Sequence, residues 1–484
     1  MKFNLLNSPV NFLKHYLAQF DHEKSLKDYE SWWEKEGKAI STSVDRNGTP
    51  WVKTHSRSGE RIDQILYPQE YRKMLYKGYK SGVIWRAFEE NSVVPHYLFG
   101  YVTSFFDSGL YCPYTVSMGT SVPVFKYADD ETKSKYLPKL TAKDDTVWQG
   151  ATWMTEIKGG SDLGNNIKTT AVKDGNSWKL TGDKYFCSNA GSELAVVAAR
   201  PENVEKGVKG IALFLVPRYR ENGKLNYTIR RLKDKIATRS VPTGEVDLRD
   251  SDAFLLGNQE LGIYVIMEVL NISRVANSVG SVALAQRAIS EAFNFAKNRR
   301  AFGKPIIEHS LLNKQFEERY RQLQNTFSLA WEAVRLLDEV WNEKPPYSDR
   351  YHLFRLIAHL AKYWTAEFAV DTAKWAMEVH GGLGTLQEYP VERWLREAMI
   401  LSIWEGTSHR QILDGLAVME KKNVHRVLAE SLSTYGNKTC LTEVCNSIDH
   451  ILSLQKDEKE ASAENVFREF AKVVSISLFE KYKN

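Results

Sequence analysis

One acidic residue, Glu405, lies at a predicted junction between two helices. Residues 391–403 alternate apolar and charged residues at helical spacing, and Gly406 is suited to ending that helix. Residues 408–411, S-H-R-Q, have the form of a capping box that begins a second helix. Because a bulky neighbour such as Trp404 raises the pKa of a carboxyl group by desolvation, Glu405 could serve as a general base. The alternative from these residues alone is a solvated glutamate at a helix end.

A second segment combines glycine with hydroxyl residues. Residues 153–163, W-M-T-E-I-K-G-G-S-D-L, form a predicted strand that leads into a turn, with hydroxyl groups at Thr155 and Ser161. Glycine lets a ligand approach the backbone closely, and hydroxyls with free N–H groups suit a flavin edge or a phosphate. On the local pattern alone, an ordinary glycine turn is the favoured interpretation.

The elements that must position these residues begin with a mainly helical N-terminal domain, residues 1–147. Residues 67–86 carry an apolar and aromatic pattern without strand alternation, which predicts a helix. Residues 129–140 have the pattern of a short amphipathic helix that is entered through Asp130. Residues 54–71 are polar and then apolar, which predicts a surface loop leading into a helix.

Residues 148–258 predict a separate β domain. Short runs rich in β-branched or aromatic residues follow one another without intervening helices, which indicates an antiparallel sheet or barrel and excludes a nucleotide-binding βαβ unit. Residues 173–177, K-D-G-N-S, have the sequence of a hairpin turn. The predicted strands are residues 147–155, 167–172, 178–186, 194–199, 210–216, 227–232 and 244–248.

Residues 259–423 return to helical patterns and predict a four-helix bundle that carries Glu405. Residues 424–484 predict a helical tail, whose apolar residues suit packing on the bundle or on a partner subunit. The domains together indicate an α+β protein. The four predicted bundle helices are residues 262–300, 311–341, 351–380 and 391–421.

Composition excludes several classes of protein. The 484 residues suffice for about three domains, and 65 basic against 60 acidic residues give no case for a nucleic-acid or anionic membrane partner. Residues 421–484 carry 10 basic and 9 acidic residues, which is no DNA-binding patch. No apolar run approaches the roughly 20 residues that span a bilayer, and Pro9 interrupts any secretory signal, so we expect a cytoplasmic protein. Four cysteines without C-x-x-C spacing indicate neither a disulfide framework nor a metal site.

Three segments resemble motifs of one flavoprotein family, the acyl-CoA dehydrogenases. Residues 403–408, I-W-E-G-T-S, are similar to the family's I-Y-E-G-T, whose glutamate removes the α-proton of a fatty acyl thioester. Residues 153–163 resemble T-E-P-x-x-G-S-D, although Ile157 and Lys158 stand where the family has proline. Residues 182–189, G-D-K-Y-F-C-S-N, resemble G-x-K-x-W-I-T-N. The motifs occur in order on the expected secondary structure, and the resemblance covers Met1 to about Asn423.

The resemblance implies roles for residues of the β domain. Thr155 would face the flavin of FAD, and Ser161 would lie near the acyl-CoA. Phe186 would stack near the isoalloxazine, and Ser188 would donate a hydrogen bond to it. Phenylalanine in place of the family's tryptophan keeps the stacking surface and loses the indole N–H.

The resemblance also implies roles for the C-terminal helices. Arg299 and Phe302 match an R-x-x-F-G stretch that reaches the FAD of a neighbouring subunit in relatives, where the arginine meets pyrophosphate. Arg274 aligns with an arginine near the catalytic carboxylate. V-H-G-G at residues 379–382 resembles a phosphate-contacting turn, beside which Glu378 replaces the common glutamine and creates a mild electrostatic mismatch.

The complete set of implied site residues follows from the same match. Glu405 and Arg274 would be catalytic, and Ser161, Arg274 and Glu405 would contact the substrate, with no metal ion. The implied FAD contacts are Met154, Thr155, Gly160, Ser161, Phe186, Cys187, Ser188, Arg299, Phe302, Gly381, Gly382, Trp404, Gly406, Thr407 and His409.

Within the family, the chain looks most similar to the AidB-like branch. The segments that carry this likeness include residues 58–68, S-G-E-R-I-D-Q-I-L-Y-P, residues 111–115, Y-C-P-Y-T, and residues 231–240, R-L-K-D-K-I-A-T-R-S. That branch is associated with bulky or long acyl ligands and, in some members, with weak turnover or a nucleic-acid connection.

The implied activity is α,β-desaturation of an acyl-CoA to a trans-2-enoyl-CoA, with Glu405 as base and hydride transfer to flavin. Implied partners are an electron-transfer flavoprotein or another acceptor, and further copies of the chain in a dimer or a dimer of dimers. The alternative is an AidB-like flavoprotein of low turnover that binds acyl-CoA or lipid, or associates with nucleic acid. The sequence does not specify the length of the acyl chain.

Overall fold

The computed structural model describes residues 2–68 and 70–483, with the side chain of Lys2 left out. These residues form two compact units, and the helices α6 (Val94–Phe106) and α10 (Gly262–Asn298) each run from one unit into the other. No helix of the described residues is long and apolar enough to cross a membrane. Unit 1 comprises residues 2–31, 100–108 and 274–483, and unit 2 comprises residues 32–68, 70–99 and 109–273.

The N-terminal part of unit 2 is mainly helical, as predicted, but two details differ. The helix predicted over residues 67–86 is interrupted at Gly82, whose φ of +106° ends α4 in the left-handed region. The cap of α8 is Asp129, because its carboxylate accepts from the N–H of Thr132, and the predicted entry through Asp130 is wrong. The helices are α3 (Lys38–Asn47), α4 (Tyr71–Ser81), α5 (Trp85–Glu89), α7 (Tyr111–Tyr127), α8 (Asp130–Leu140) and α9 (Leu163–Asn166), with a π-helical turn at Trp33–Gly37.

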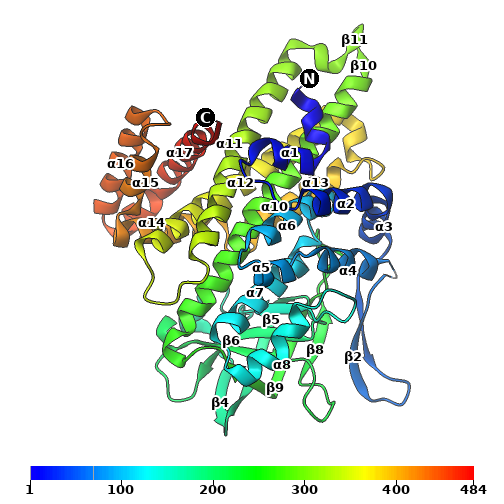
Figure 1. The fold of residues 1–484 in the computed structure, drawn as a ribbon, viewed down its shortest axis with the longest axis vertical. Helices are drawn as coiled ribbons and strands as arrows, with labels where there is room; N and C mark the ends of the chain where they lie inside the picture. The colour runs from blue at the N-terminus through cyan, green and yellow to red at the C-terminus, as the bar shows by residue number, and fades with distance from the viewer. Residues whose placement is uncertain (1, 69, 484) are drawn as a thin grey trace. The chain divides into compact units, whose positions relative to one another are not determined.

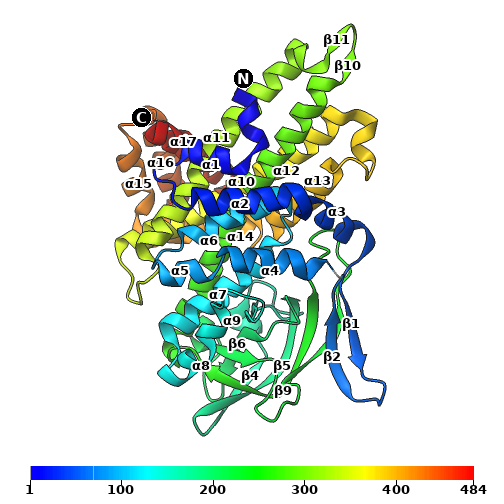
Figure 2. The ribbon, with the colours of Figure 1, turned by 45° about the vertical axis from the view of Figure 1, so that its right-hand side comes forward.

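The surface loop predicted over residues 54–71 is instead a β-hairpin of β1 (Trp51–His55) and β2 (Arg61–Leu66), visible in Figure 2. The alternation of apolar and polar residues that marks a strand is not visible in the sequence, because a charged residue, Asp63, occupies an inward position of β2. Asp63 is fully buried, and its carboxylate accepts from the backbone N–H of Ile229 at 2.8 Å and from Arg61 at 3.1 Å. The hairpin is thus fastened to the strand that carries Ile229.

Seven strands of unit 2 form a closed β structure. Hydrogen bonding runs through β6, β4, β5, β9 and β7 and returns to β6, while β3 adds to β6 and β8 adds to β9. The strand pairs β4–β5, β5–β9, β6–β7, β7–β9 and β8–β9 are antiparallel, as predicted, whereas β3 and β4 both run parallel to β6. The strands are β3 (Gly150–Trp153), β4 (Thr170–Asp174), β5 (Ser177–Ser188), β6 (Leu194–Pro201), β7 (Ala212–Pro217), β8 (Tyr227–Leu232) and β9 (Thr243–Leu255).

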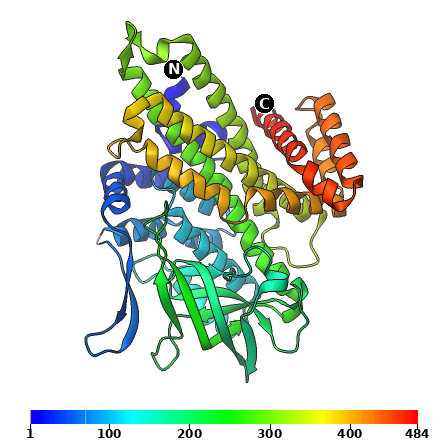
Figure 3. The same ribbon diagram turned by 180° about the vertical axis from the view of Figure 1, so that it is seen from behind.

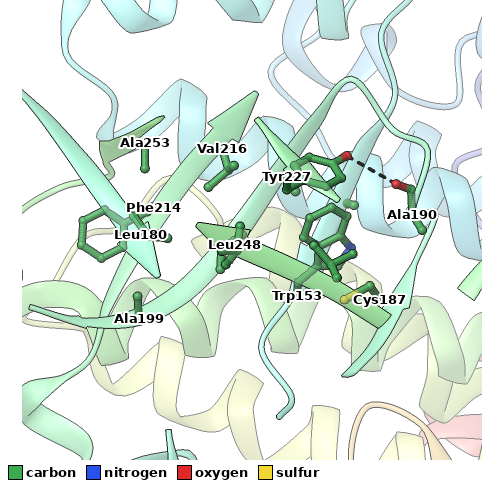
Figure 4. Packing of buried hydrophobic residues seen from close by; sticks show 14 of the residues in the cluster. Trp153, Leu180, Cys187, Ala190, Ala199, Phe214, Val216, Tyr227, Leu248 and Ala253 are labelled. Carbon is green, nitrogen blue, oxygen red and sulfur yellow. Dashed lines mark hydrogen bonds between the residues drawn. The ribbon is translucent and has the colours of Figure 1, made fainter. Parts of the chain in front are cut away.

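Strand β6 is buried on both faces, since its side chains alternate between two hydrophobic clusters. The odd positions, such as Val197, join the interior cluster of the β structure, in which Trp153 meets Tyr227 edge to face at 4.9 Å (Figure 4). The even positions, such as Val196, pack with residues of α7, α8 and the start of α10. Helices therefore cover one side of the sheet.

Unit 1 is a helical bundle, in which α11, α12 and α13 run alongside one another (Figures 1 and 3). Its N-terminal segment is fixed to the bundle: the amide of Gln286 donates to the carbonyl of Leu6 at 2.9 Å, and the rings of Phe12 and Phe327 meet edge to face. The elements are a 3-10 helix (Lys2–Asn7), α1 (Pro9–Tyr16), α2 (Glu23–Trp32, its last residue in unit 2), the second half of α10, the hairpin β10 (Arg300–Ala301) and β11 (Lys304–Pro305), α11 (Ser310–Val340), α12 (Asp349–His380), α13 (Val391–Ile403) and α14 (Ser408–Lys422).

The predicted tail consists of α15 (Val424–Leu432), α16 (Lys438–Ser453) and α17 (Lys456–Lys483). Of the two packing partners that the sequence left open, the bundle is the one observed. Phe467 is fully buried and its ring lies 5.5 Å from that of Tyr363, while Arg468 donates to the Tyr363 hydroxyl at 3.0 Å. Tyr482 donates to Glu332 of α11. The tail helices lie together beside α14 in Figure 1.

Candidate active site

Glu405 lies in a sharp turn between α13 and α14, which confirms the predicted break between two helices. Its φ is +58° and that of Gly406 is +98°, so both residues are in the left-handed region. Outside glycine, this conformation costs about 1–3 kcal/mol and persists only where the surroundings impose it. The contacts of the turn show what imposes it here.

The predicted capping box is wrong. Ser408 donates to the carboxylate of Glu367 at 2.8 Å, and the amide of Gln411 donates to the two carbonyl groups of the turn at 3.1 and 3.0 Å. The residue at the cap position is Thr407, which makes no capping hydrogen bond with its side chain. The physical reason is that the end of α13 leaves carbonyl groups without helical partners, and Gln411 satisfies them.

Three more side chains, from α10 and α12, satisfy carbonyl groups around Glu405. The amide of Asn277 binds the last turn of α13, the fully buried ammonium group of Lys362 binds carbonyls on both sides of Glu405, and Arg274 binds the carbonyl of Glu405 itself. These contacts hold the strained turn. The donor–acceptor pairs are Asn277–Leu401 (3.0 Å), Lys362–Ser402 (3.1 Å), Lys362–Gly406 (2.7 Å) and Arg274–Glu405 (3.4 Å).

The carboxylate of Glu405 has no hydrogen bond or ion pair to any described residue. It remains partly accessible to solvent, yet the protein around it is dense enough that burial raises its pKa to about 7. The nearby charges of Arg274 and Lys362 act in the opposite direction and lower the pKa. A carboxylate that is unpartnered, reachable and poised near neutral pH is a competent general base.

The same turn offers backbone donors. In the described structure, the N–H groups of Glu405 and Gly406 have no acceptor, and the first turn of α14 has no side-chain cap. A helix N-terminus carries a partial positive charge, so oxygen atoms that bear negative charge are stabilised there. The carboxylate of Glu405 and a set of free hydrogen-bond donors therefore lie on one short segment.

Buried groups of α10, α12 and α14 support the segment from behind. His359 is fully buried, and its Nδ1 lies 2.9 Å from the amide oxygen of Gln411; burial lowers its pKa well below the usual value. Burial lowers the pKa of Lys362 to about 7, against the opposing charge of Glu405. Arg274 is 3% exposed and lies 3.5 Å from the carboxylate of Asp414.

In unit 2, the two motifs predicted to bind flavin lie side by side. The backbone N–H of Tyr185 donates to the carbonyl of Thr155 at 2.9 Å, and the indole of Trp153 donates to the carbonyl of Ser188 at 3.1 Å. Phe186 is 57% exposed and has a φ of +55°, an unusual combination for a large apolar residue. The ammonium group of Lys233 lies 4.8 Å from its ring.

Not every predicted flavin residue presents its side chain to solvent. The side chain of Cys187 is fully buried in the interior cluster, and that of Met154 is 8% exposed in the cluster under the helices. Gly160 and Ser161 lie exposed in the turn after β3, and a Cβ at Gly160 would meet no atom within 4 Å.

A buried ion pair fixes both motifs of unit 2 and was not predicted from the sequence. The ammonium group of Lys184 is 2.7 Å from the carboxylate of Glu156. That carboxylate also accepts from the hydroxyl of Thr169 at 2.6 Å and from the backbone N–H of Lys168 at 2.7 Å. Lys184 and Glu156 stand inside the two motifs, so the pair joins the segment of Thr155 to the segment of Phe186.

The remaining predicted residues of unit 1 lie at the other end of α12. The rings of Phe295 and His380 stack at 4.2 Å, which brings the region of Arg299 and Phe302 to the turn that follows α12. Phe302, at a hairpin tip, is 96% exposed, and a Cβ at Gly381 or Gly382 would meet no atom within 4 Å. Glu378 is ion-paired to Lys374 at 2.5 Å, so its predicted electrostatic mismatch is reduced.

These residues lie far from Glu405 of the same copy. Lys362 and Gly381 are 19 residues apart on and just after one helix, which at a rise of 1.5 Å per residue is about 28 Å. The turn of Glu405 contacts α12 at Lys362. The described residues contain no cluster of three or more His, Cys, Asp or Glu side chains that could hold a metal ion.

Sequence reasoning missed Lys362, His359 and Gln411 as parts of the site. The available signal was a lysine and a histidine three residues apart, both within an otherwise apolar or aromatic helical stretch, residues 356–364. A buried charge needs a partner, and here the partners are backbone carbonyl groups 40 and 44 residues away in the chain.

Comparison with known proteins matches three family models to the chain. Residues 5–145 match the adaptive response protein AidB N-terminal domain, residues 151–251 the acyl-CoA dehydrogenase middle domain, and residues 260–419 the acyl-CoA dehydrogenase C-terminal domain.

Individual relatives agree with these matches. Acyl-CoA dehydrogenase family member 11 of Caenorhabditis elegans is 30% identical over 80% of this chain and 66% of its own length. The mitochondrial short-chain specific acyl-CoA dehydrogenase of Bos taurus is 32% identical over 60% of this chain and 67% of its own length.

Two solved structures show the same fold at lower identity. Caenorhabditis elegans ACDH-11 in complex with C11-CoA superposes with a TM-score of 0.86 at 24% identity, over 99% of this chain and 88% of that one. The acyl-CoA dehydrogenase complexed with FAD from Bacillus anthracis gives a TM-score of 0.75 at 20% identity, over 95% and 81%. The chain belongs to the acyl-CoA dehydrogenase family and carries an AidB-type N-terminal domain.

Proposed function

We propose that this protein is an FAD-dependent dehydrogenase that desaturates an acyl-CoA thioester between its α and β carbons, with Glu405 as the general base. The observation that carries the proposal is the carboxylate of Glu405: it is free of partners, partly accessible, and has a pKa of about 7. The relatives named above as acyl-CoA dehydrogenases, and one structure with C11-CoA bound, support the class of substrate.

The base must remove a weakly acidic proton. As Glu405 takes the α-proton, negative charge develops on the thioester oxygen, and hydrogen-bond donors placed there lower the barrier. The free N–H groups of the turn are the donors that this chain offers next to the base. Arg274 and Lys362 keep part of the Glu405 population ionised near neutral pH, since their positive charges oppose the effect of burial.

Each unit by itself offers residues that fit part of FAD. In unit 2, the exposed ring of Phe186 and the adjacent backbone of Thr155 and Ser188 present an apolar face next to polar groups. In unit 1, the indole N–H of Trp404 is buried without a partner among the described residues, and Gly381 leaves open space beside its backbone. Bound FAD would supply the acceptor for the hydride that leaves the β carbon.

The second group of unit 1 residues fits the FAD of a neighbouring copy. Arg299 and Phe302 lie with the glycine turn at the far end of α12, about 28 Å along the helix from Lys362. Phe302 is a large apolar side chain that is 96% exposed, which is typical of a residue covered by a partner. We therefore expect a homo-oligomer in which each copy completes the cofactor site of another.

Flavin reduction tests the proposed function. Purified protein with bound FAD is kept anaerobic, and its flavin absorbance is followed while short, branched and long acyl-CoAs are added. Rapid bleaching by one chain class would establish the reaction and name its substrate, and reoxidation by an added electron-transfer flavoprotein would identify an acceptor. Flavin that stays oxidised with every thioester would refute the dehydrogenase and leave a flavoprotein that only binds acyl-CoA or lipid.

A further inference from the structure

We propose that Lys362 is a positioning residue for Glu405: its side-chain nitrogen ties together the two ends of the turn that carries the base, and its protonated form places a positive charge near the carboxylate. This inference rests on the proposed function only in taking Glu405 as the general base. The contacts of Lys362 themselves belong to the fold.

The hydrogen bonds of Lys362 bracket the base. Its Nζ donates to the carbonyl of Ser402, three residues before Glu405, at 3.1 Å, and to the carbonyl of Gly406, directly after it, at 2.7 Å. The first acceptor belongs to the end of α13 and the second to the left-handed turn. One side chain therefore fixes the segment on both sides of the catalytic carboxylate.

The ammonium group is held where water does not reach it. Lys362 is 0% exposed, so it could not stay charged without the two carbonyl oxygens and a nearby negative group. No carboxylate lies within ion-pair distance of it among the described residues, and the electrostatic partner that acts on it most strongly is Glu405. The positive charge of Lys362 therefore acts on Glu405 and on the backbone carbonyl groups that position it.

Other charged groups also lie near Lys362 and Glu405, and they limit how far the charge of Lys362 alone shifts the pKa of Glu405. Arg274 of α10 acts on both residues, and His359 of α12 is kept neutral by burial. The remaining groups are Arg355 and Glu367 on α12, and Arg410 and Asp414 on α14, which are ion-paired to each other. Because the lysine is one of two cations near the carboxylate, its removal must shift the titration of Glu405 upward without abolishing it.

The test measures the protonation of Glu405 directly, independently of turnover. In infrared difference spectra, the C=O band of a protonated carboxylic acid that is present in the native protein and absent from Glu405→Gln reports this one residue. The holoprotein is titrated from pH 5 to pH 10. We expect the midpoint of this band to lie near pH 7 in the native protein and about 1 unit higher in Lys362→Met.

Two further variants separate charge from backbone support. Lys362→Gln keeps N–H donors without a charge and should raise the midpoint as Lys362→Met does, with less loosening of residues 401–411 in amide hydrogen exchange. Lys314→Met removes an exposed lysine of α11 and should leave both readouts unchanged. If Lys362→Met does not fold, Lys362→Gln alone decides.

The proposal would be overturned if the carboxylic acid band of Glu405 titrated with the native midpoint in folded Lys362→Met or Lys362→Gln. Equal hydrogen exchange of residues 401–411 in Lys362→Met and the native protein would overturn the positioning role. The flavin-bleaching assay answers a different question. If no acyl-CoA reduces the native flavin while the carboxyl titration shifts as expected, the proposed function fails and the role of Lys362 stands.

Discussion

The charge of Arg274 should set the lower pH limit of the reaction. Arg274 is 3% exposed, donates to the carbonyl of Glu405 at 3.4 Å, and is the larger of the two opposing charges that hold down the pKa of that residue. Arg274→Gln removes the charge and keeps an amide that can still donate a hydrogen bond. The pKa of Glu405 must then rise above about 7, because burial is opposed by Lys362 alone.

The size of the effect follows from the influence of a neighbouring charge. An arginine next to a carboxylate shifts the pKa of that carboxylate by about 1–3 units, and Lys362 still opposes burial in the variant, so we expect a rise of about 1–2 units. A rise of about 1–2 units would lower the ionised fraction of Glu405 at pH 7 from about one half to between about one tenth and one hundredth. Flavin reduction at pH 7 should therefore slow by about 5-fold to 50-fold.

Stopped-flow flavin reduction between pH 5.5 and pH 9.5 checks this expectation. The acid limb of the rate profile should move to higher pH in Arg274→Gln, and the rate should recover towards the native value above that limb. Arg274→Lys, which keeps the charge, should retain the native limb. An Arg274→Gln protein that holds its flavin and shows an unshifted limb would refute the electrostatic reasoning.

Three other predictions concern stability. The pKa of Glu405 is raised from 4.5 to about 7, so the free energy of unfolding of the native protein falls by up to about 3 kcal/mol as the pH rises through that interval. In urea denaturation, Glu405→Gln should therefore be more stable than the native protein by about that amount at pH 8 and nearly equal to it at pH 4.5. Lys184→Met leaves the buried Glu156 without its cation and should cost about 3–5 kcal/mol, measured the same way. Phe467→Ala removes a fully buried ring between the tail and the bundle and should cost about 3–5 kcal/mol, whereas Val427→Ala at an exposed tail position should change stability by less than about 0.5 kcal/mol.

Each of these has an outcome that contradicts it. A Glu405→Gln protein equally destabilised at both pH values would mean that the carboxylate is not held at an unfavourable pKa. Adding Glu156→Gln to Lys184→Met should restore part of the stability that Lys184→Met loses. A double variant that is no more stable than Lys184→Met would show that the two residues act separately. A Phe467→Ala protein as stable as Val427→Ala would mean that the tail does not contribute to the bundle.

The sequence was sufficient for the features that repeat regularly along the chain. Apolar periodicity located three of the four predicted bundle helices and the tail, whereas the fourth, residues 391–421, is divided into α13 and α14 by the turn of Glu405. The hairpin at Gly175 was evident from its turn residues. For Glu405, the local residues predicted its place at a break between two helices, and the resemblance to the acyl-CoA dehydrogenases favoured a general base over a solvated glutamate. These signals are local, and tertiary contacts did not override them.

Features that depend on distant partners were not predictable. Asp63 hides the alternation of β2 because its partner is a backbone N–H in β8. Gln411 resembles a capping residue, but its amide is taken by the carbonyl groups of the turn. Parallel pairing of β3 and β4 with β6 leaves no mark on the strand pattern, since periodicity shows which residues are inward and not which strand is the neighbour.

The most direct test of the central claim compares the native protein with Glu405→Gln in anaerobic flavin reduction by the acyl-CoA that bleaches the native enzyme fastest. The substitution keeps the size of the side chain and removes its ability to accept a proton. We expect Glu405→Gln to retain bound FAD and to lose at least about 10²-fold in the rate of flavin reduction, because general-base catalysis contributes about 10²–10⁴-fold. A variant that bleaches at the native rate would place the base elsewhere and contradict the assignment of Glu405.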